Sequence, residues 1–378
     1  MGRNLASSIP VTEIRAVKIK THLQALHPRN VFRISRAARR ETVNVFLRLE
    51  HDGIAGLGEA SANAFYGEDA ADVARRLGGL GGFLEGRRVE SVEDIAGIWE
   101  EAWGLLAPSR AAQCALDVAL WDWLGKRRKC TVTELALGTE PRPVVSFATI
   151  GISGEEELER KIAELEGFPM VKVKVDGTGD LSLVARVREA MPEARIALDA
   201  NCAWGEIDMG KVARELAPLG IEFIEQPLPP GRDGDLRRFC EGLPVPVMAD
   251  ESCVTFNDVE RIFGGKNHGW TRMDTDGREY AGFNIKLVKC GGITPALRMS
   301  RRGKEMRLKT MVGCMLESSL LIAAGAVVGQ VTDYTDLDGA WLLGDDPARG
   351  WTFERGVLSP ADGSGLGGTV AMLEPEKE

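Results

Sequence analysis

Three acidic residues, each closing a short apolar run, recur at nearly constant intervals and constrain the fold more than any other feature. Asp199 ends RIALD, Glu225 ends IEFIE, and Asp250 follows VPVMA. The intervals are 26 and 25 residues, about the length of one strand-helix unit in a (β/α) barrel. Because the C-terminal ends of parallel barrel strands meet at one mouth, we expect the three carboxylates to converge there.

Lysines occupy the same place in the neighbouring units. Lys174 ends MVKVK one unit before the acids, and Lys286 ends FNIK one unit after them. Lys172 lies two residues before Lys174, so both side chains should share one face of the strand. Ammonium groups inside a barrel need carboxylates or an anionic ligand nearby. Lys289 has the opposite strand parity to Lys286, and we expect it to point outward.

The acids and lysines together indicate a divalent-cation site between two proton carriers. Asp and Glu without His or Cys suit a hard cation, which means Mg²⁺, with Mn²⁺ as the alternative. A lysine on each side of a substrate carbon could remove a proton from one face and return it to the other. The pattern therefore predicts a 1,1-proton transfer next to a carboxylate, with inversion of the carbon.

Composition excludes several other classes of function. The chain has 378 residues and a net charge of -9, with no basic stripe that would indicate a nucleic-acid partner. It contains neither a signal-peptide pattern nor a stretch long enough to span a bilayer, so we expect a cytoplasmic protein without a membrane partner. Seven cysteines without a CxxC pair, and without a histidine in the same segments, predict reduced thiols rather than a catalytic cysteine.

The N-terminal part is predicted to be an α+β capping domain over residues 1–140. Apolar residues at 3–4 spacing predict helices at 68–101 and 109–129, the second with Ser109 as N-cap. Residues 22–41 are polar and basic and predict a loop. Alternating apolar and polar residues predict three antiparallel strands, at 13–20, 43–50 and 52–60.

From residue 144 onward, strand and helix patterns alternate. We expect a (β/α)7β barrel over 141–355, followed by a tail, 356–378, that returns to the capping domain. An open doubly wound sheet is the alternative, but it would scatter the acids. Residues 264–282 lengthen the interval before Lys286, and they predict either a surface insertion or a contact with a partner subunit. We expect the protein to be a homo-oligomer.

The motifs KVK, LDAN, IEQP, ADES and NIKLVKCGGI, with GLGEA and ALDVALWDWLGK in the capping region, resemble the enolase superfamily, muconate lactonizing enzyme subgroup. The resemblance spans essentially the whole chain. It implies an α/β fold, a modified TIM barrel of (β/α)7β type with an α+β capping domain. It implies that Lys174 and Lys286 are the catalytic acid/base pair, assisted by Lys172, and that three residues bind Mg²⁺: Asp199, Glu225 and Asp250.

The segment TDLDG distinguishes among the reactions of the subgroup. Asp336 and Asp338 look like the DxD element of dipeptide epimerases, in which the pair holds the N-terminal ammonium of the substrate. Two carboxylates on one face of an extended segment do suit a cation. Thr149 resembles a threonine that touches substrate in those enzymes. The resemblance therefore implies a dipeptide substrate and inversion at its C-terminal residue.

Side-chain preference and two other functions remain open at this point. The position of the arginine that grips a glutamate side chain in L-Ala-D/L-Glu epimerases aligns best with Ala37, but the segment also offers Arg29, Arg33, Arg36, Arg39 and Arg40. His27, Arg29 and Phe32 are candidate substrate contacts, and a solvated basic loop is the alternative. A cycloisomerase or o-succinylbenzoate synthase of the same subgroup would use the same acids and lysines without needing Asp336. A catalytically silent barrel kept for binding is the alternative from a different class.

Overall fold

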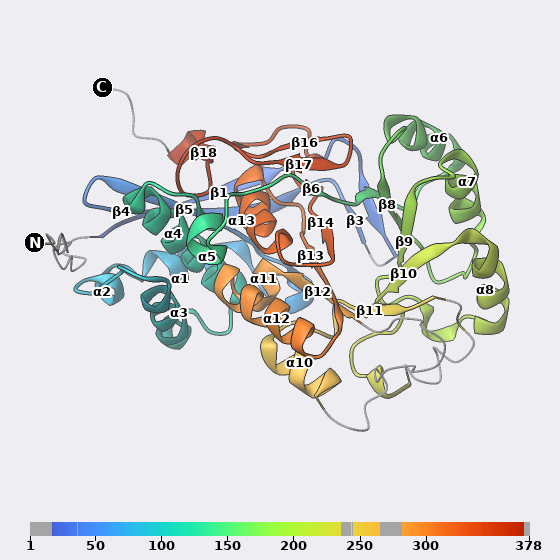
Figure 1. The fold of residues 1–378 in the computed structure, drawn as a ribbon, viewed down its shortest axis with the longest axis horizontal. Helices are drawn as coiled ribbons and strands as arrows, with labels where there is room; N and C mark the ends of the chain where they lie inside the picture. The colour runs from blue at the N-terminus through green and yellow to red at the C-terminus, as the bar shows by residue number, and fades with distance from the viewer. Residues whose placement is uncertain (1–16, 36, 236–242, 244, 265–281, 374–378) are drawn as a thin grey trace, which may run out of the picture.

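The computed structural model describes residues 17–35, 37–235, 243, 245–264 and 282–373. An antiparallel sheet with helices occupies one side of the molecule, and a barrel of parallel strands occupies the other (Figure 1). Nearly all of the predicted 264–282 insertion and the first residues of the strand predicted at 13–20 lie outside the described residues.

Eight parallel strands form the barrel. The backbone N–H of Phe147 donates to the carbonyl oxygen of Thr335 at 2.9 Å and joins the first strand region to the last, so the barrel is nearly closed. This arrangement confirms the predicted modified TIM barrel and excludes the open sheet. In spatial order, which is also chain order, the strands are β7 (Ala148–Ile150), β8 (Met170–Lys174), β9 (Arg195–Asp199), β10 (Ile221–Glu225), β11 (Val247–Ala249), β12 (Gly282–Lys286), β13 (Lys309–Gly313) and β14 (Tyr334–Asp336).

Helices cover the outside of the barrel, and α6, α7 and α8 lie along the outer side of β8, β9 and β10 (Figure 1). Within the described residues, none of the helices is both long and apolar enough to cross a membrane. The helices of this region are α6 (Glu155–Glu164), α7 (Ser182–Ala190), α8 (Met209–Leu216), α10 (Phe256–Phe263), α11 (Leu287–Cys290), α12 (Ile293–Glu305) and α13 (Ser319–Gly329), with the short 3-10 turns η2 (Trp204–Glu206), η3 (Ala217–Leu219) and η4 (Asp233–Asp235).

The barrel interior is filled by an apolar layer below its charged mouth. Ala197, Phe223 and Met248 each lie two residues before one of the three predicted acids. Because side chains alternate along a strand, the apolar residue and the acid share the inward face, and the acid lies nearer the C-terminal end. The buried inner layer consists of Phe147, Met170, Ala197, Phe223, Met248 and Met311.

The capping region combines an antiparallel sheet with helices. Ser109 Oγ accepts a hydrogen bond from Ala112 N at 3.0 Å, which confirms the predicted N-cap. The single helix predicted over 68–101 was wrong, because glycines at 79 and 86 interrupt it and Ser91 starts a new helix with a capping box. The elements are β1 (Lys18–Leu26), β4 (Thr42–His51), β5 (Ile54–Ser61), η1 (Ala64–Tyr66), α1 (Ala70–Gly78), α2 (Gly81–Leu84), α3 (Val92–Leu106), α4 (Arg110–Arg128) and α5 (Val132–Leu137).

The loop predicted over 22–41 was also wrong. Strand β1 continues to Leu26 because its residues pair with β4 along their whole length, and the next residues form a hairpin of β2 (Phe32–Ile34) and β3 (Ala37–Arg39). The hairpin reaches the barrel, where Arg33 O accepts from Ile152 N at 3.2 Å. An N-terminal hairpin therefore covers the mouth that the barrel strands create.

Two further connections join the parts of the chain. The fully buried Glu59 of β5 accepts hydrogen bonds from Asn44 Nδ2 at 2.7 Å and from Ser318 N, at the start of α13, at 3.0 Å. The C-terminal segment returns to the capping region, where Gly365 O accepts from Val132 N at 2.9 Å. The remaining short elements are β6 (Val144–Val145), β15 (Ala348–Arg349), β16 (Thr352–Glu354), β17 (Val357–Ser359), β18 (Thr369–Val370) and η5 (Ala371–Leu373).

Candidate active site

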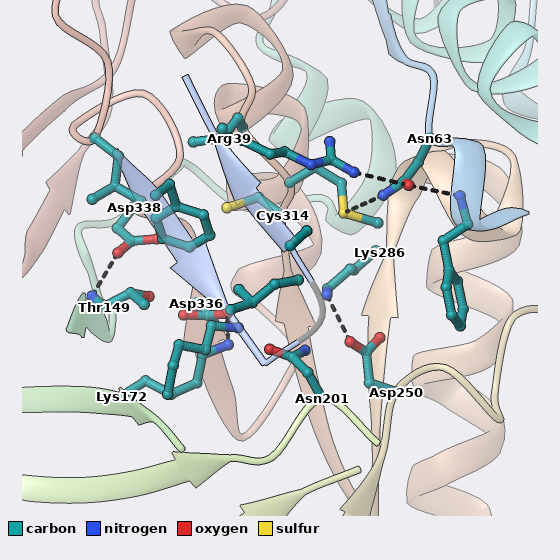
Figure 2. A pocket seen from close by; sticks show the side chains of 18 of the residues that line it. Arg39, Asn63, Thr149, Lys172, Asn201, Asp250, Lys286, Cys314, Asp336 and Asp338 are labelled. Carbon is teal, nitrogen blue, oxygen red and sulfur yellow. Dashed lines mark hydrogen bonds and ion pairs between the residues drawn. The ribbon is translucent and has the colours of Figure 1, made fainter. Parts of the chain in front are cut away.

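A cavity of about 270 Å³ lies at the barrel mouth under the β2–β3 hairpin. Figure 2 shows Lys172 and Asp336 on one side of this cavity and Lys286 with Asp250 on the other. Asp199 and Glu225 are fully buried and do not line the cavity, but they contact lysines that do. Of the predicted site residues, those that line the cavity are Thr149, Lys172, Lys174, Asp250, Lys286, Asp336 and Asp338.

The ammonium of Lys172 is surrounded by carboxylates from three strands. Its Nζ donates to Asp336 and, at 3.1 Å, to Glu225 Oε2, and it lies 3.8 Å from Asp199 Oδ2. Burial alone would lower the pKa of Lys172, but these three carboxylates raise it well above its ordinary value. Lys172 is therefore a permanent positive charge within the acidic cluster.

Lys174 and Lys286 approach the cavity from opposite strands. Lys174 ends β8 and Lys286 ends β12, and these strands are four positions apart in an eight-stranded barrel. Lys174 Nζ donates to Asp199 Oδ2, and Lys286 Nζ donates to Asp250 Oδ2 at 2.7 Å. A molecule between the two amines would have one on each side.

Each of the three predicted ligands has its two oxygens in different surroundings. One oxygen accepts from a lysine that lines the cavity. The other oxygen accepts from a donor that is not one of these lysines. Asp199 Oδ1 accepts from the Asn201 backbone N–H at 2.9 Å, and Glu225 Oε1 accepts from Asn284 Nδ2 at 2.7 Å. On Asp250 this second donor is the ammonium of Lys289.

These carboxylates repel one another and attract cations. Burial and the neighbouring Asp199 charge raise the pKa of Glu225 to about 8. Burial opposes ionisation of Asp250 as well, but Lys286 and Lys289 hold its pKa below its ordinary value. A buried cluster whose carboxylates already bind ammonium groups has the charge and donor chemistry for a divalent cation.

The carboxyl groups are not gathered into a ready coordination shell. Among the described residues, no three acidic, histidine or cysteine side chains lie close enough together to hold one ion as they are placed. Each carboxylate is bonded to a lysine instead. The donor set fits Mg²⁺. Asp199, Glu225 and Asp250 would hold the ion if the oxygen of each carboxylate that accepts from a lysine bound the ion instead.

The DxD pair lies on the Lys172 side of the cavity, next to Thr149 (Figure 2). Asp338 Oδ2 accepts from Thr149 N at 2.6 Å, and burial together with the Asp336 charge raises the pKa of Asp338 to about 6. Asp336 Oδ1 is buried and has no hydrogen-bond partner among the described residues. This oxygen is available to a donor that enters the cavity.

The rest of the cavity wall is mainly apolar. Arg39 of the hairpin lines it and donates to Asn63 Oδ1 at 3.1 Å. Of the candidate contacts His27, Arg29 and Phe32, Phe32 lines this cavity, while Arg29 stacks on Trp341 at 4.4 Å and His27 pairs with Glu41. Cys314 also lines the wall, and burial raises its pKa well above the ordinary value. The apolar lining residues are Phe32, Ile34, Ala37, Phe65, Met315, Leu316 and Leu342.

The expectation that Lys289 points outward was wrong. Strand β12 ends at Lys286 and the chain turns at once into α11, so strand parity no longer applies to Lys289. Its side chain is 1% exposed and contacts Asp250. Asn284, which sequence reasoning also missed, lies two residues before Lys286, and this spacing could have indicated that it faces inward.

Known protein families match both parts of the chain. The family described as "Mandelate racemase / muconate lactonizing enzyme, N-terminal domain" matches residues 14–138, and "Enolase C-terminal domain-like" matches residues 155–373. The chain therefore belongs to the enolase superfamily, in the mandelate racemase and muconate lactonizing enzyme subgroup. Within this subgroup it is a member of the dipeptide and amino-acid epimerase family, whose enzymes are isomerases.

Three relatives illustrate the similarity. A hydrophobic dipeptide epimerase of Roseobacter litoralis is 34% identical over 94% of this chain and 99% of its own length. An L-Ala-D/L-amino acid epimerase of Flavobacterium johnsoniae is 33% identical over 90% of this chain and 96% of its own. The dipeptide epimerase of Methylococcus capsulatus, solved with Mg and L-Arg-D-Lys, is 30% identical with a TM-score of 0.82, covering 94% of this chain and 99% of that chain.

Proposed function

We propose that this protein is a Mg²⁺-dependent dipeptide epimerase that inverts the α-carbon of the C-terminal residue. The observation that carries the proposal is the placement of Lys174 and Lys286 on strands from opposite sides of one cavity, each next to a buried carboxylate. Inversion of a carbon by proton exchange needs one such group on each face.

The two lysines would exchange roles with the direction of reaction. One amine accepts the α-proton from its face, and the other ammonium returns a proton to the opposite face, so no proton is lost overall. Lys172 keeps a positive charge beside the carboxylates throughout. A divalent cation held by Asp199, Glu225 and Asp250 would supply positive charge at the substrate carboxylate, whose negative charge grows as the proton leaves.

The DxD pair would hold the amino end of the substrate. Asp336 Oδ1 and the carboxylate of Asp338 offer oxygen acceptors on the cavity wall, and an ammonium provides three N–H donors. Thr149 orients Asp338 through its backbone N–H. Dipeptides and their epimerases are named among the relatives, which supports this class of substrate.

The test is incubation of the protein with Mg²⁺ and a library of L,L-dipeptides in deuterated water, followed by mass spectrometry and chiral chromatography. We expect deuterium at the α-carbon of the C-terminal residue together with the L,D product. If no dipeptide in the library gains deuterium while the protein is folded and binds Mg²⁺, the proposal fails.

Single lysine variants sharpen the test. Lys174→Ala should stop α-proton exchange from one stereoisomer of the dipeptide, and Lys286→Ala should stop it from the other. Loss of exchange from the same stereoisomer in both variants would contradict the two-base assignment. Lys211→Ala is the matched control, because Lys211 is exposed on α8, away from the cavity, and its loss should leave exchange from both stereoisomers unchanged.

A cycloisomerase or o-succinylbenzoate synthase of the same subgroup is the second candidate. Its substrate carries no ammonium, so Asp336→Asn should leave turnover of such a substrate nearly unchanged while it impairs a dipeptide epimerase.

The catalytically silent barrel would be supported by a failure to bind Mg²⁺ in calorimetry. The homo-oligomer and the cytoplasmic location stay predictions.

A further inference from the structure

Lys289 is a buried ammonium group that the proposed proton transfer does not use. It lies on α11, outside the cavity lining, and its side chain is 1% exposed. An ammonium is rarely buried without several oxygen partners, because leaving water is costly. The partners of Lys289 should therefore indicate what this residue does.

The four oxygens that Lys289 contacts belong to Asp250 and Cys253, which follow β11, and to Asn284 within the neighbouring strand β12. Its Nζ donates to Asp250 O at 2.6 Å, Cys253 O at 3.1 Å and Asn284 O at 3.2 Å, and also to Asp250 Oδ1. The first three contacts fix the backbone where β11 ends and join it to β12. The fourth fixes one oxygen of the carboxylate itself.

The carboxylate of Asp250 is consequently held between two lysines. Lys289 binds Oδ1 from outside the cavity, while Lys286, which lines the cavity, binds Oδ2 at 2.7 Å. With Oδ1 and the adjacent carbonyl tied to one ammonium, rotation of the carboxylate is restricted. Oδ2 is left as the oxygen directed to Lys286.

We infer that Lys289 is a positioning residue that sets the orientation of the Asp250 carboxylate, both as a ligand for a divalent cation and as the partner of Lys286. The inference rests on the proposed function. A donor behind a metal-binding carboxylate fixes its direction, and loss of such a partner typically weakens metal affinity by about 10–100-fold.

The experiment is calorimetric titration of Mg²⁺ into the full-length Lys289→Met and Lys289→Gln variants. Methionine keeps the length of the side chain and removes its charge and donors, whereas glutamine keeps N–H donors for the carbonyl oxygens. We expect Mg²⁺ affinity to fall by about 10–100-fold in the methionine variant, with a smaller loss in the glutamine variant.

Lys126→Met is the matched control, because Lys126 also donates to a buried aspartate, Asp122, at 2.6 Å, but in the capping region. It should bind Mg²⁺ like the unchanged protein. Unchanged Mg²⁺ affinity in a folded Lys289→Met variant overturns the inference. If neither Lys289 variant folds while Lys126→Met does, Lys289 only stabilises the fold and the inference is also overturned.

A second readout separates positioning from general stability. Because Lys289 acts on the partner of Lys286, α-proton exchange from the stereoisomer that depends on Lys286 should fall more in Lys289→Gln than exchange that depends on Lys174. Equal losses for the two stereoisomers would contradict the inference. If no dipeptide is turned over by the unchanged protein, the proposed function fails, but the Mg²⁺ titration still decides the role of Lys289.

Discussion

Four buried lysines surround the barrel mouth, and each one contacts at least one carboxylate: Lys172, Lys174, Lys286 and Lys289. Their charges compensate those of acids that would otherwise repel one another in a buried cluster. Removing one member of a buried ion pair leaves an uncompensated charge, which typically costs about 3–5 kcal/mol. The residues that carry the proposed chemistry therefore also influence the stability of the barrel.

Lys172→Met should show this link directly. The variant leaves three carboxylates without their shared ammonium, so we expect the free energy of unfolding to fall by about 3–5 kcal/mol in urea denaturation without metal. Saturating Mg²⁺ should recover part of the loss, because the ion replaces the missing positive charge. An equal loss with and without Mg²⁺ would contradict the placement of the ion next to Lys172.

Asp338→Asn should test the recognition of an ammonium group. The amide oxygen can still accept from Thr149 N, so the local structure should persist while the negative charge is lost. We expect kcat/KM for a free dipeptide to fall by about 10–100-fold, as for loss of one charge-assisted hydrogen bond. The ratio of kcat/KM for the free and N-acetylated dipeptides should fall as well, and an unchanged ratio would contradict this role.

At the scale of elements, the alternation of side chains along each strand directs the acids and lysines into the barrel mouth. Helices join the capping region to the barrel. Helix α4 packs on β5, and its buried Asp117 accepts from the Thr294 backbone N–H at 3.0 Å and from the Thr294 hydroxyl, at the start of α12. Burial raises the pKa of Asp117 to about 7. We therefore expect the junction between the capping helix α4 and the barrel helix α12 to respond to pH.

The pH dependence of stability should reveal Asp117. The folded protein binds this proton more tightly than the unfolded chain, so the contribution of Asp117 to stability is greatest below pH 4 and declines as pH rises to about 7. The free energy of unfolding should therefore fall with pH relative to Asp117→Asn, by at most about 1.4 kcal/mol per pH unit. Denaturant unfolding from pH 4 to 8 measures this difference, and the exposed Asp362→Asn variant should retain the original profile.

At the scale of the whole molecule, one hydrophobic core extends through both parts. It includes Leu47 and Trp123 of the capping region as well as Val173 and Ile285 of the barrel strands. Glu59 adds a buried hydrogen-bonded connection between β5 and α13. Capping region and barrel should therefore unfold together, because neither can keep its buried surface without the other.

Calorimetric unfolding should consequently give a single transition, and Mg²⁺ should shift it upward. At 100 times its dissociation constant, an ion that binds only the folded state adds about 2.7 kcal/mol to the free energy of unfolding. The shift should be lost with EDTA and much reduced in Asp250→Ala. Two separate transitions, or a shift that persists in Asp250→Ala, would contradict these expectations.

Much of the fold could be predicted from repeated local patterns. Acids and lysines at strand ends, spaced by one strand-helix unit, predicted a parallel barrel because a barrel brings those strand ends together at one mouth. The structure confirms the barrel. The errors arose where local pattern was a poor guide. Residues 22–41 were polar enough to predict a loop, but pairing with β4 made part of them a strand, and glycines divided one predicted helix into three.

The sequence by itself determined the barrel and the placement of its acids and lysines at strand ends, because unit length and side-chain parity depend on local geometry. Only the tertiary structure decided which groups contact each other. It placed Lys172 among three carboxylates, and it turned the chain after Lys286 so that Lys289 reaches Asp250 from behind. Such contacts depend on how neighbouring strands pack, and the pattern of a single strand does not contain that information.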